Sequence, residues 1–162
     1  MVKHLLLRKK QTGFTYLAIL FAIAVAGAML AKTGLDWSQA SQREKERELL
    51  FIGNEYRKAI TLYYERTPGA VKKYPEKLEN LLYDTRYLTP QRYLRKLYRD
   101  PISNRADWGL VMAPEGGIMG VHSLSNAAPV KITGFTNADS AFENSAKYSD
   151  WVFSYIPPTP VK

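Results

Sequence analysis

The sequence of 162 residues contains no cysteine and only two histidines. Without cysteine there is neither a disulfide framework nor a thiolate metal site, so thiol-based redox chemistry is excluded. His4 lies in a basic N-terminal segment, and His122 precedes Ser123 on an expected strand, where successive side chains point to opposite faces. The pair therefore does not form a serine–base–acid site. There is also no glycine-rich phosphate loop after a strand and no His-x-x-x-His spacing. We expect no enzymatic activity.

Carboxylates are sparse in the C-terminal region, which bears on metal binding. A calcium ion takes about six to eight oxygen ligands, several of them from converging carboxylates. Residues 126–150 offer only Asp139, Glu143 and Asp150, which are widely spaced. We treat these three as weak calcium candidates whose simpler interpretation is solvated loop acids, and we expect no cofactor.

The formal net charge of +8 is unevenly distributed. Lys3, Arg8, Lys9 and Lys10 lie within the first thirteen residues, and the remaining chain has 19 Lys and Arg against 15 Asp and Glu. A second basic stretch, Arg92–Arg99, interleaves cations with Tyr93 and Tyr98, a pattern that nucleic-acid sites also use. On a helix, however, the tyrosines and cations would separate onto opposite faces. We therefore expect core packing with a solvated basic face, with protein contacts as an alternative, and no nucleic-acid partner.

An uncharged apolar run of eighteen residues extends from Phe14 to Ala31. As a helix it would reach roughly 27 Å, near the lower limit for crossing a bilayer core. The positive cluster precedes the run, so the positive-inside rule keeps the N-terminus cytoplasmic and sends the rest across the membrane. A cleaved secretory signal peptide and an uncleaved anchor also fit this pattern, the former because of the small-residue triplets between Ala22 and Ala28.

The junction between the basic leader and the run separates these alternatives. Gly13-Phe14-Thr15-Tyr16-Leu17 resembles the prepilin signal of type IV pilins and pseudopilins. The resemblance implies that a prepilin peptidase cleaves between Gly13 and Phe14 and that Phe14 becomes N-methylated. Family members usually carry glutamate at the fifth mature position, where this sequence has Ala18. That departure leaves a minor or initiating role open.

Beyond the run, the chain is typical of one long helix that continues into a small domain. Asp36–Glu65 has no proline, and residues 43–48 have the mixed charges of a solvated helical surface. An apolar stripe recurs at helical spacing, formed by Leu49, Ile52, Tyr56, Ile60 and Tyr63. Thr67-Pro68-Gly69 should end the helix, which from Phe14 to Glu65 would measure roughly 78 Å.

Short elements are expected after the helix. Leu78, Leu81 and Leu82 form a small apolar face, and Thr89-Pro90 reads as the start of a short helix toward Tyr98. Strands are expected at 108–112, 118–124, 130–133 and 151–156, with Pro-Glu-Gly-Gly at 114–117 suiting a hairpin. The predicted fold is α+β and pilin-like, with a long N-terminal helix, its first half transmembrane, packed on a small antiparallel sheet.

The soluble part looks like the pseudopilins of type II secretion, in the branch of the major subunit. The resemblance covers residues 14–130 in outline and is carried by Tyr74-Pro75 to Leu82, Arg92–Arg95, Tyr98–Pro101, Asp107-Trp108 and Gly120–Ser123. It implies a filament subunit of a short periplasmic pseudopilus that supports protein export across the outer membrane. Its partners would be the prepilin peptidase, other pseudopilins and the inner-membrane secretion platform.

The domain organisation follows from these features. We expect a prepilin leader at 1–13, a transmembrane helical half at 14–35, and a periplasmic domain at 36–162, with helix to about 65, short helices at 75–99 and sheet at 107–156. The protein would cross the bacterial inner membrane once, with a cytoplasmic N-terminus. Two alternatives remain: a type IV pilin for adhesion, motility or DNA uptake, and a membrane-anchored periplasmic binding domain without a filament.

Overall fold

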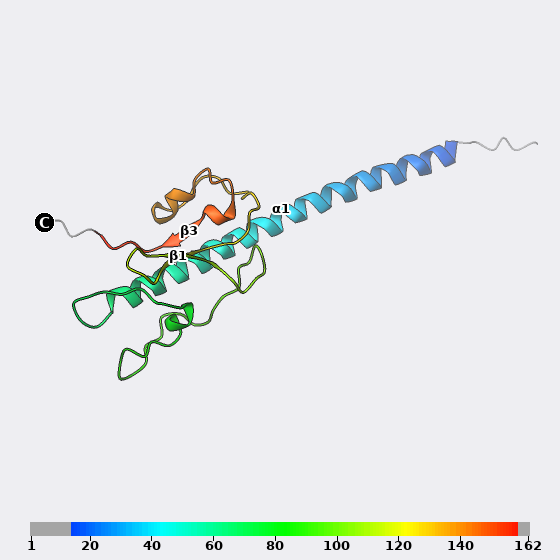
Figure 1. Ribbon diagram of the computed structural model, residues 1–162. Coiled ribbons are helices and arrows are strands. Elements are labelled where there is room, and N and C mark those ends of the chain that lie inside the picture. The colour runs from blue at the N-terminus through cyan, green and yellow to red at the C-terminus, as the bar shows by residue number, and fades with distance from the viewer. Residues whose placement is uncertain (1–13, 159–162) are drawn as a thin grey trace, which may run out of the picture. The chain divides into compact units, whose positions relative to one another are not determined.

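The computed structural model describes residues 14–158, and at 14, 28 and 30–36 it describes the backbone alone. The chain divides into two units between Ala40 and Ser41. Helix α1, Phe14–Glu65, supplies all of the described part of the first unit and the opening segment of the second (Figure 1). The predicted leader, including Gly13, lies outside the described residues.

The second unit is an α+β domain with three antiparallel strands. β1 is Gly109–Met112, β2 is Ile118–His122 and β3 is Val152–Ser154, in the order β1-β2-β3. Val121 of the central strand pairs with Leu110 on one side and Phe153 on the other. Three short 3₁₀ helices complete the described elements: η1, Leu78–Leu81; η2, Asn137–Phe142; and η3, Tyr148–Asp150. The prediction of an α+β fold with an antiparallel sheet is confirmed.

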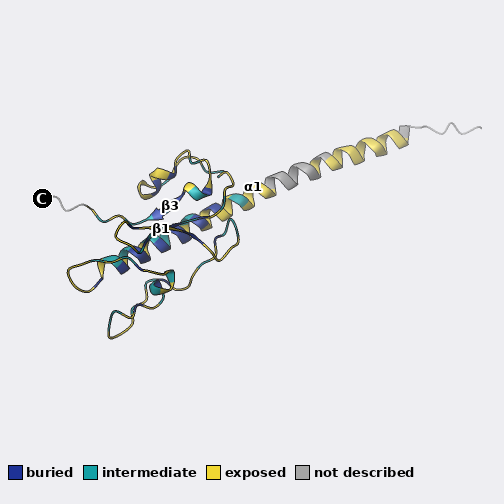
Figure 2. Cartoon of the chain, in the orientation of Figure 1, coloured by how far each residue is buried: buried dark blue, intermediate teal, exposed yellow. Residues whose placement is uncertain are grey.

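The helical stripe predicted from the sequence forms one wall of the core. All five of its members are buried, from Leu49 to Tyr63 (Figure 2). They belong to one apolar cluster with residues of the sheet and the C-terminal segment, among them Ile118, Val121, Trp151 and Phe153. Gly53 lies against the ring of Phe153, so closely that a Cβ at this position would overlap the ring. Glycine therefore permits the close approach of α1 to β3.

Two further predictions are confirmed: α1 ends at Glu65, just before Thr67-Pro68-Gly69, and β1 and β2 form a hairpin. Thr67 Oγ1 donates to the carbonyl of Tyr63 at 3.0 Å, and Gly69 follows in the left-handed region at φ 86°. Thr67 thus binds a carbonyl that the helix leaves without a partner at its end. In the hairpin, Gly116 and Gly117 both have positive φ, which glycine adopts at little cost.

Two predicted elements are wrong. Residues 90–98 are not helical: the amides of Tyr93 and Leu94 both donate to the carbonyl of Leu81, at 2.9 and 3.0 Å. Residues 75–99 therefore contain η1 as their only described helix. Residues 130–133 are not a strand either, because the amides of Val130 and Lys131 bind the carboxylate of Glu46 instead of a neighbouring strand. In both cases a partner distant in the sequence takes the backbone donors.

Candidate interaction surface

The first part of α1 presents apolar side chains outward. Exposed large hydrophobic residues here are Tyr16, Leu17, Ile19, Leu20, Phe21, Ile23, Val25 and Met29. Figure 2 colours this part of the helix as exposed wherever side chains are described. They surround the helix rather than forming one stripe, so this part of α1 cannot bury them on a single flat partner. A contiguous apolar surface of this kind marks a site of contact with protein or lipid.

Ala18 lies within this apolar surface. With Leu17, Leu20 and Phe21 it lines an open depression of about 570 Å³. All four lining residues are apolar. The chemistry available at this position is apolar packing, in place of the ion pair that a carboxylate would offer.

Among the residues whose side chains are described, no helix combines the length and the apolar character needed to cross a membrane. The predicted span of residues 14–35 gains no support from that search. The side chains of Ala28 and of residues 30–36 lie outside the described set, as does that of Phe14.

The weak calcium candidates do not come together. Asp139 accepts from Arg57 Nη1 at 2.8 Å, and also from Asn54 and Thr136. Asp150 accepts from the amide of Lys147 at 3.1 Å, and Glu143 is exposed. Within the described residues, no three acidic or histidine side chains are grouped as a metal site would require. Asp139 instead ties η2 to α1 through a buried ion pair.

His122 and Ser123 do not face each other. His122 Nδ1 lies 2.9 Å from the carbonyl of Ser123, whereas Ser123 Oγ donates to Asp100 Oδ2 at 2.7 Å. Asp100 also accepts from Ser103 Oγ and from the amide of Ile102. The serine and the aspartate, both buried, therefore tie the turn after Asp100 to the end of β2. Their geometry provides no histidine base for the serine.

Glu46 is buried, contrary to prediction. The mixed charges of residues 43–48 predict a solvated helical face, but Glu46 is only 2% exposed. Its carboxylate accepts from the amide of Val130 at 2.5 Å, the amide of Lys131 at 3.2 Å and the hydroxyl of Tyr148 at 2.8 Å. Helical spacing does indicate this burial, because Glu46 lies three residues before Leu49 and therefore on the same helical face as the buried stripe.

The contact with Glu46 changes the pKa of Tyr148. Burial and the hydrogen bond that it donates to Glu46 raise the pKa of Tyr148 to about 12, although the Gln42 amide, which donates to the same hydroxyl, opposes the rise. The folded domain thus favours the protonated phenol over the phenolate.

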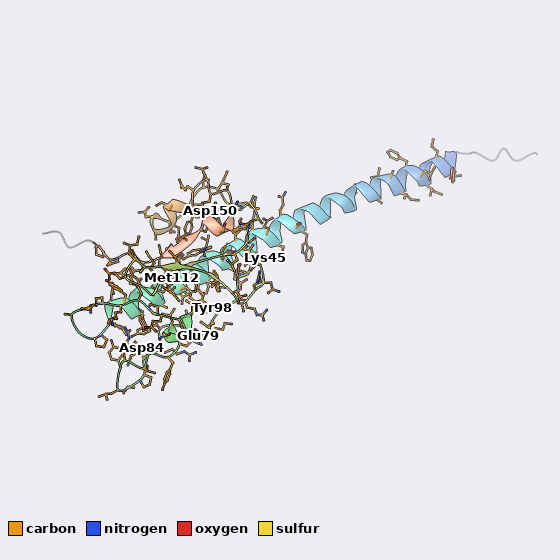
Figure 3. All side chains as sticks on the ribbon, viewed as in Figure 1. Lys45, Glu79, Asp84, Tyr98, Met112 and Asp150 are labelled. Carbon is orange, nitrogen blue, oxygen red and sulfur yellow. The ribbon has the colours of Figure 1, made fainter. Side chains whose placement is uncertain are left out.

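Asp84, which is labelled in Figure 3, is buried and forms an ion pair with the partly buried Arg86 near the C-terminal end of α1. Arg86 donates to both carboxylate oxygens of Asp84, to the carbonyl of Tyr63 and to Thr67 Oγ1. Burial alone would raise the pKa of Asp84, but the hydrogen bonds from Arg86 and Tyr93 outweigh it and lower that pKa. The pair joins the loop after η1 to the last turn of α1.

No known protein family, curated protein or solved structure matches this chain. The candidate surface therefore has to be interpreted from its own residues.

Proposed function

We propose that this chain is a pseudopilin-like subunit of a type II secretion apparatus, which assembles into a short periplasmic pseudopilus and supports protein export across the outer membrane. The observation that carries the proposal is the contrast within α1. Its first part presents apolar side chains outward, whereas its second part buries an apolar stripe against the α+β domain. Apolar side chains on the first part need a partner outside the chain, and a filament of packed helices provides one.

Lipid is the partner before assembly. The run from Phe14 to Ala31 would lie in the bacterial inner membrane, with the basic leader in the cytoplasm and the domain in the periplasm. A prepilin peptidase would cleave between Gly13 and Phe14 and the new N-terminus would be methylated. The other pseudopilins and the inner-membrane platform would then receive the subunit.

Ala18 narrows the role within such a filament. At this position a carboxylate would be expensive in lipid unless it was paired, so its usual presence indicates a pairing function. Here the depression around Ala18 is lined by Leu17, Leu20 and Phe21 and offers only apolar contact. We therefore favour a minor or initiating subunit, held by packing, over an ordinary major subunit.

Site-directed cross-linking tests this assembly. The chain has no cysteine of its own, so a single Leu20→Cys substitution places the only thiol on the apolar surface. In membranes of bacteria that carry a complete secretion system, a cross-linker with one thiol-reactive arm and one photoactivated arm, which reacts with nearby C–H or N–H bonds, should join this variant to itself or to another pseudopilin. Lys147→Cys, on the exposed surface of the domain, is the matched control.

The outcomes separate the alternatives. Adducts with Leu20→Cys but few with Lys147→Cys support packing through the first part of α1. A chain that stays monomeric in both variants would favour a membrane-anchored domain without a filament. Adducts that persist when the secretion system is absent but a type IV pilus is present would favour a pilin of that system.

A further inference from the structure

The loop between η1 and β1 has a firmly held base. Asp84 and Gln91 pair as an isolated antiparallel bridge, with the amide of each donating to the carbonyl of the other at 2.9 and 3.3 Å. The guanidinium of Arg86 stacks on the ring of Tyr63 at 3.5 Å and donates to the buried carboxylate of Asp84. These contacts fix residues 84–91 to the end of α1.

The tip of this loop is apolar and uncovered. Leu88 is fully exposed, and Tyr83 beside the base is 60% exposed. Figure 1 shows the loop, in green, projecting at the lower edge of the domain. Single exposed leucines are common on protein surfaces. A leucine on a loop whose base is fixed by the ion pair of Arg86 with the buried Asp84 is different, because the loop loses little conformational entropy when it binds.

Residues 92–99, which follow the loop in the sequence, carry the excess positive charge of the domain. Residues 41–162 contain 18 Lys and Arg and 14 Asp and Glu, and four of these cations lie between 92 and 99. The four are exposed, and none forms an ion pair within the described part of the chain: Arg92, Arg95, Lys96 and Arg99. Outside this segment the charges of the domain balance. A positive potential is therefore concentrated beside the exposed loop.

We propose that residues 83–99 form a docking surface for an acidic protein segment that also carries apolar side chains. The four cations supply the complementary charge, which speeds encounter and selects the partner. Leu88 and the partly exposed Leu97 supply apolar contact. None of its residues belongs to the apolar part of α1, so the partner need not be another copy packed through that helix.

A nucleic acid fits this surface less well, because the tyrosines that could stack on bases are occupied. Tyr93 donates its hydroxyl to Asp84 at 3.0 Å, and its ring lies edge-on to Tyr63. Tyr98 packs edge-on against Tyr56 in the core. Base stacking supplies much of the affinity of single-strand binding sites, and of the rings in this segment only that of Tyr83 is largely exposed.

Binding of a synthetic peptide tests the proposal. The probe is a short fluorescent peptide in which pairs of glutamates alternate with leucines, titrated against the purified full chain in an uncharged detergent. The wild-type chain should bind it with an affinity that falls as salt rises. Arg95→Glu with Lys96→Glu should weaken binding at least about tenfold, because like charges then face the peptide. Leu88→Ser should weaken it with less change in the salt dependence.

The matched control is Lys45→Glu with Lys73→Glu, which makes the same change in charge at two exposed positions outside the loop. This variant should bind within about twofold of wild type, because its charges lie outside the docking surface. Equal loss in both double variants would overturn the proposal, since only net charge would then matter. Tighter binding of an oligonucleotide of the same charge would overturn it in favour of a nucleic-acid site. Purified protein is used throughout, so the result does not depend on cleavage or filament assembly.

Discussion

Glu46 and Val130 lie 84 residues apart in the sequence, yet the amide of Val130 donates to Glu46 Oε1 at 2.5 Å. The same carboxylate receives the amide of Lys131 and the hydroxyl of Tyr148. One buried acid on α1 thus organises a loop that has no regular secondary structure of its own. Hydrogen bonds to a charged, buried acceptor are stronger than those between neutral groups.

Replacing Glu46 by alanine should therefore destabilise the domain by about 2–4 kcal/mol, because the two amides and the phenol lose a charged partner. Chemical denaturation of the full chain in detergent measures the loss. Glu48→Ala is the control, because Glu48 is exposed on the same helix. Hydrogen exchange at Val130 and Lys131 should accelerate in the Glu46 variant. Unchanged exchange at those amides would contradict the role assigned to Glu46.

The ion pair between Arg57 and Asp139 should behave as a coupled unit. Its side chains are 15% and 5% exposed, so removal of either partner leaves the other buried without a counter-charge. Each single alanine variant should lose about 3 kcal/mol, and the double variant should lose clearly less than the sum. The exposed pair Glu55–Lys58 on the same helix should show a coupling below about 1 kcal/mol. Additive losses at Arg57 and Asp139 would show that the contact contributes nothing specific.

Alkaline pH should destabilise the domain through its buried tyrosines. Burial raises the pKa of Tyr56 to about 12, and burial with the Glu46 hydrogen bond does the same for Tyr148, from a usual value of 10.0. The unfolded chain loses these protons first, so their contribution is complete below pH 10 and is lost as pH rises toward 12. Tyr148→Phe should make stability fall less steeply over this range. An equal slope in the variant would contradict the assignment.

The sequence predicted the elements that depend on local pattern. The stripe from Leu49 to Tyr63 and the stop at Thr67 follow from helical periodicity and from proline and glycine, and both are present. The β1–β2 hairpin is likewise predicted by local pattern, namely two apolar runs on either side of the Pro-Glu-Gly-Gly turn at 114–117.

Predictions from the sequence were wrong where a partner distant in the sequence determines the backbone conformation. Nothing near Tyr93 shows that its amide binds the carbonyl of Leu81, so proline at position 90 suggested a helix instead. Residues 130–133 were likewise predicted as a strand, because nothing near them in the sequence shows that the amides of Val130 and Lys131 bind Glu46. Glu46 was misplaced because its neighbours in the sequence are charged and exposed, although its helical position lies on the buried stripe.

The processing route can be disturbed at one residue. Gly13 precedes the expected cleavage point, and a protease needs an extended, unobstructed backbone there, which glycine offers most readily. Gly13→Leu should leave the full-length precursor in the membrane when a prepilin peptidase is co-expressed. Gly27→Leu, a change of the same size within the apolar run, should leave cleavage intact. Western analysis of precursor and mature forms distinguishes the two variants, and cleavage of both would contradict the assigned junction.

The mass of the mature N-terminal peptide tests the central claim most directly. The wild-type chain, isolated from bacterial membranes that contain a prepilin peptidase, should begin at Phe14 and carry one methyl group on its amine. That result would place the chain in the pilin processing route despite Ala18. A mature N-terminus near Met29 or Lys32 would indicate ordinary signal cleavage and contradict the proposed pseudopilin.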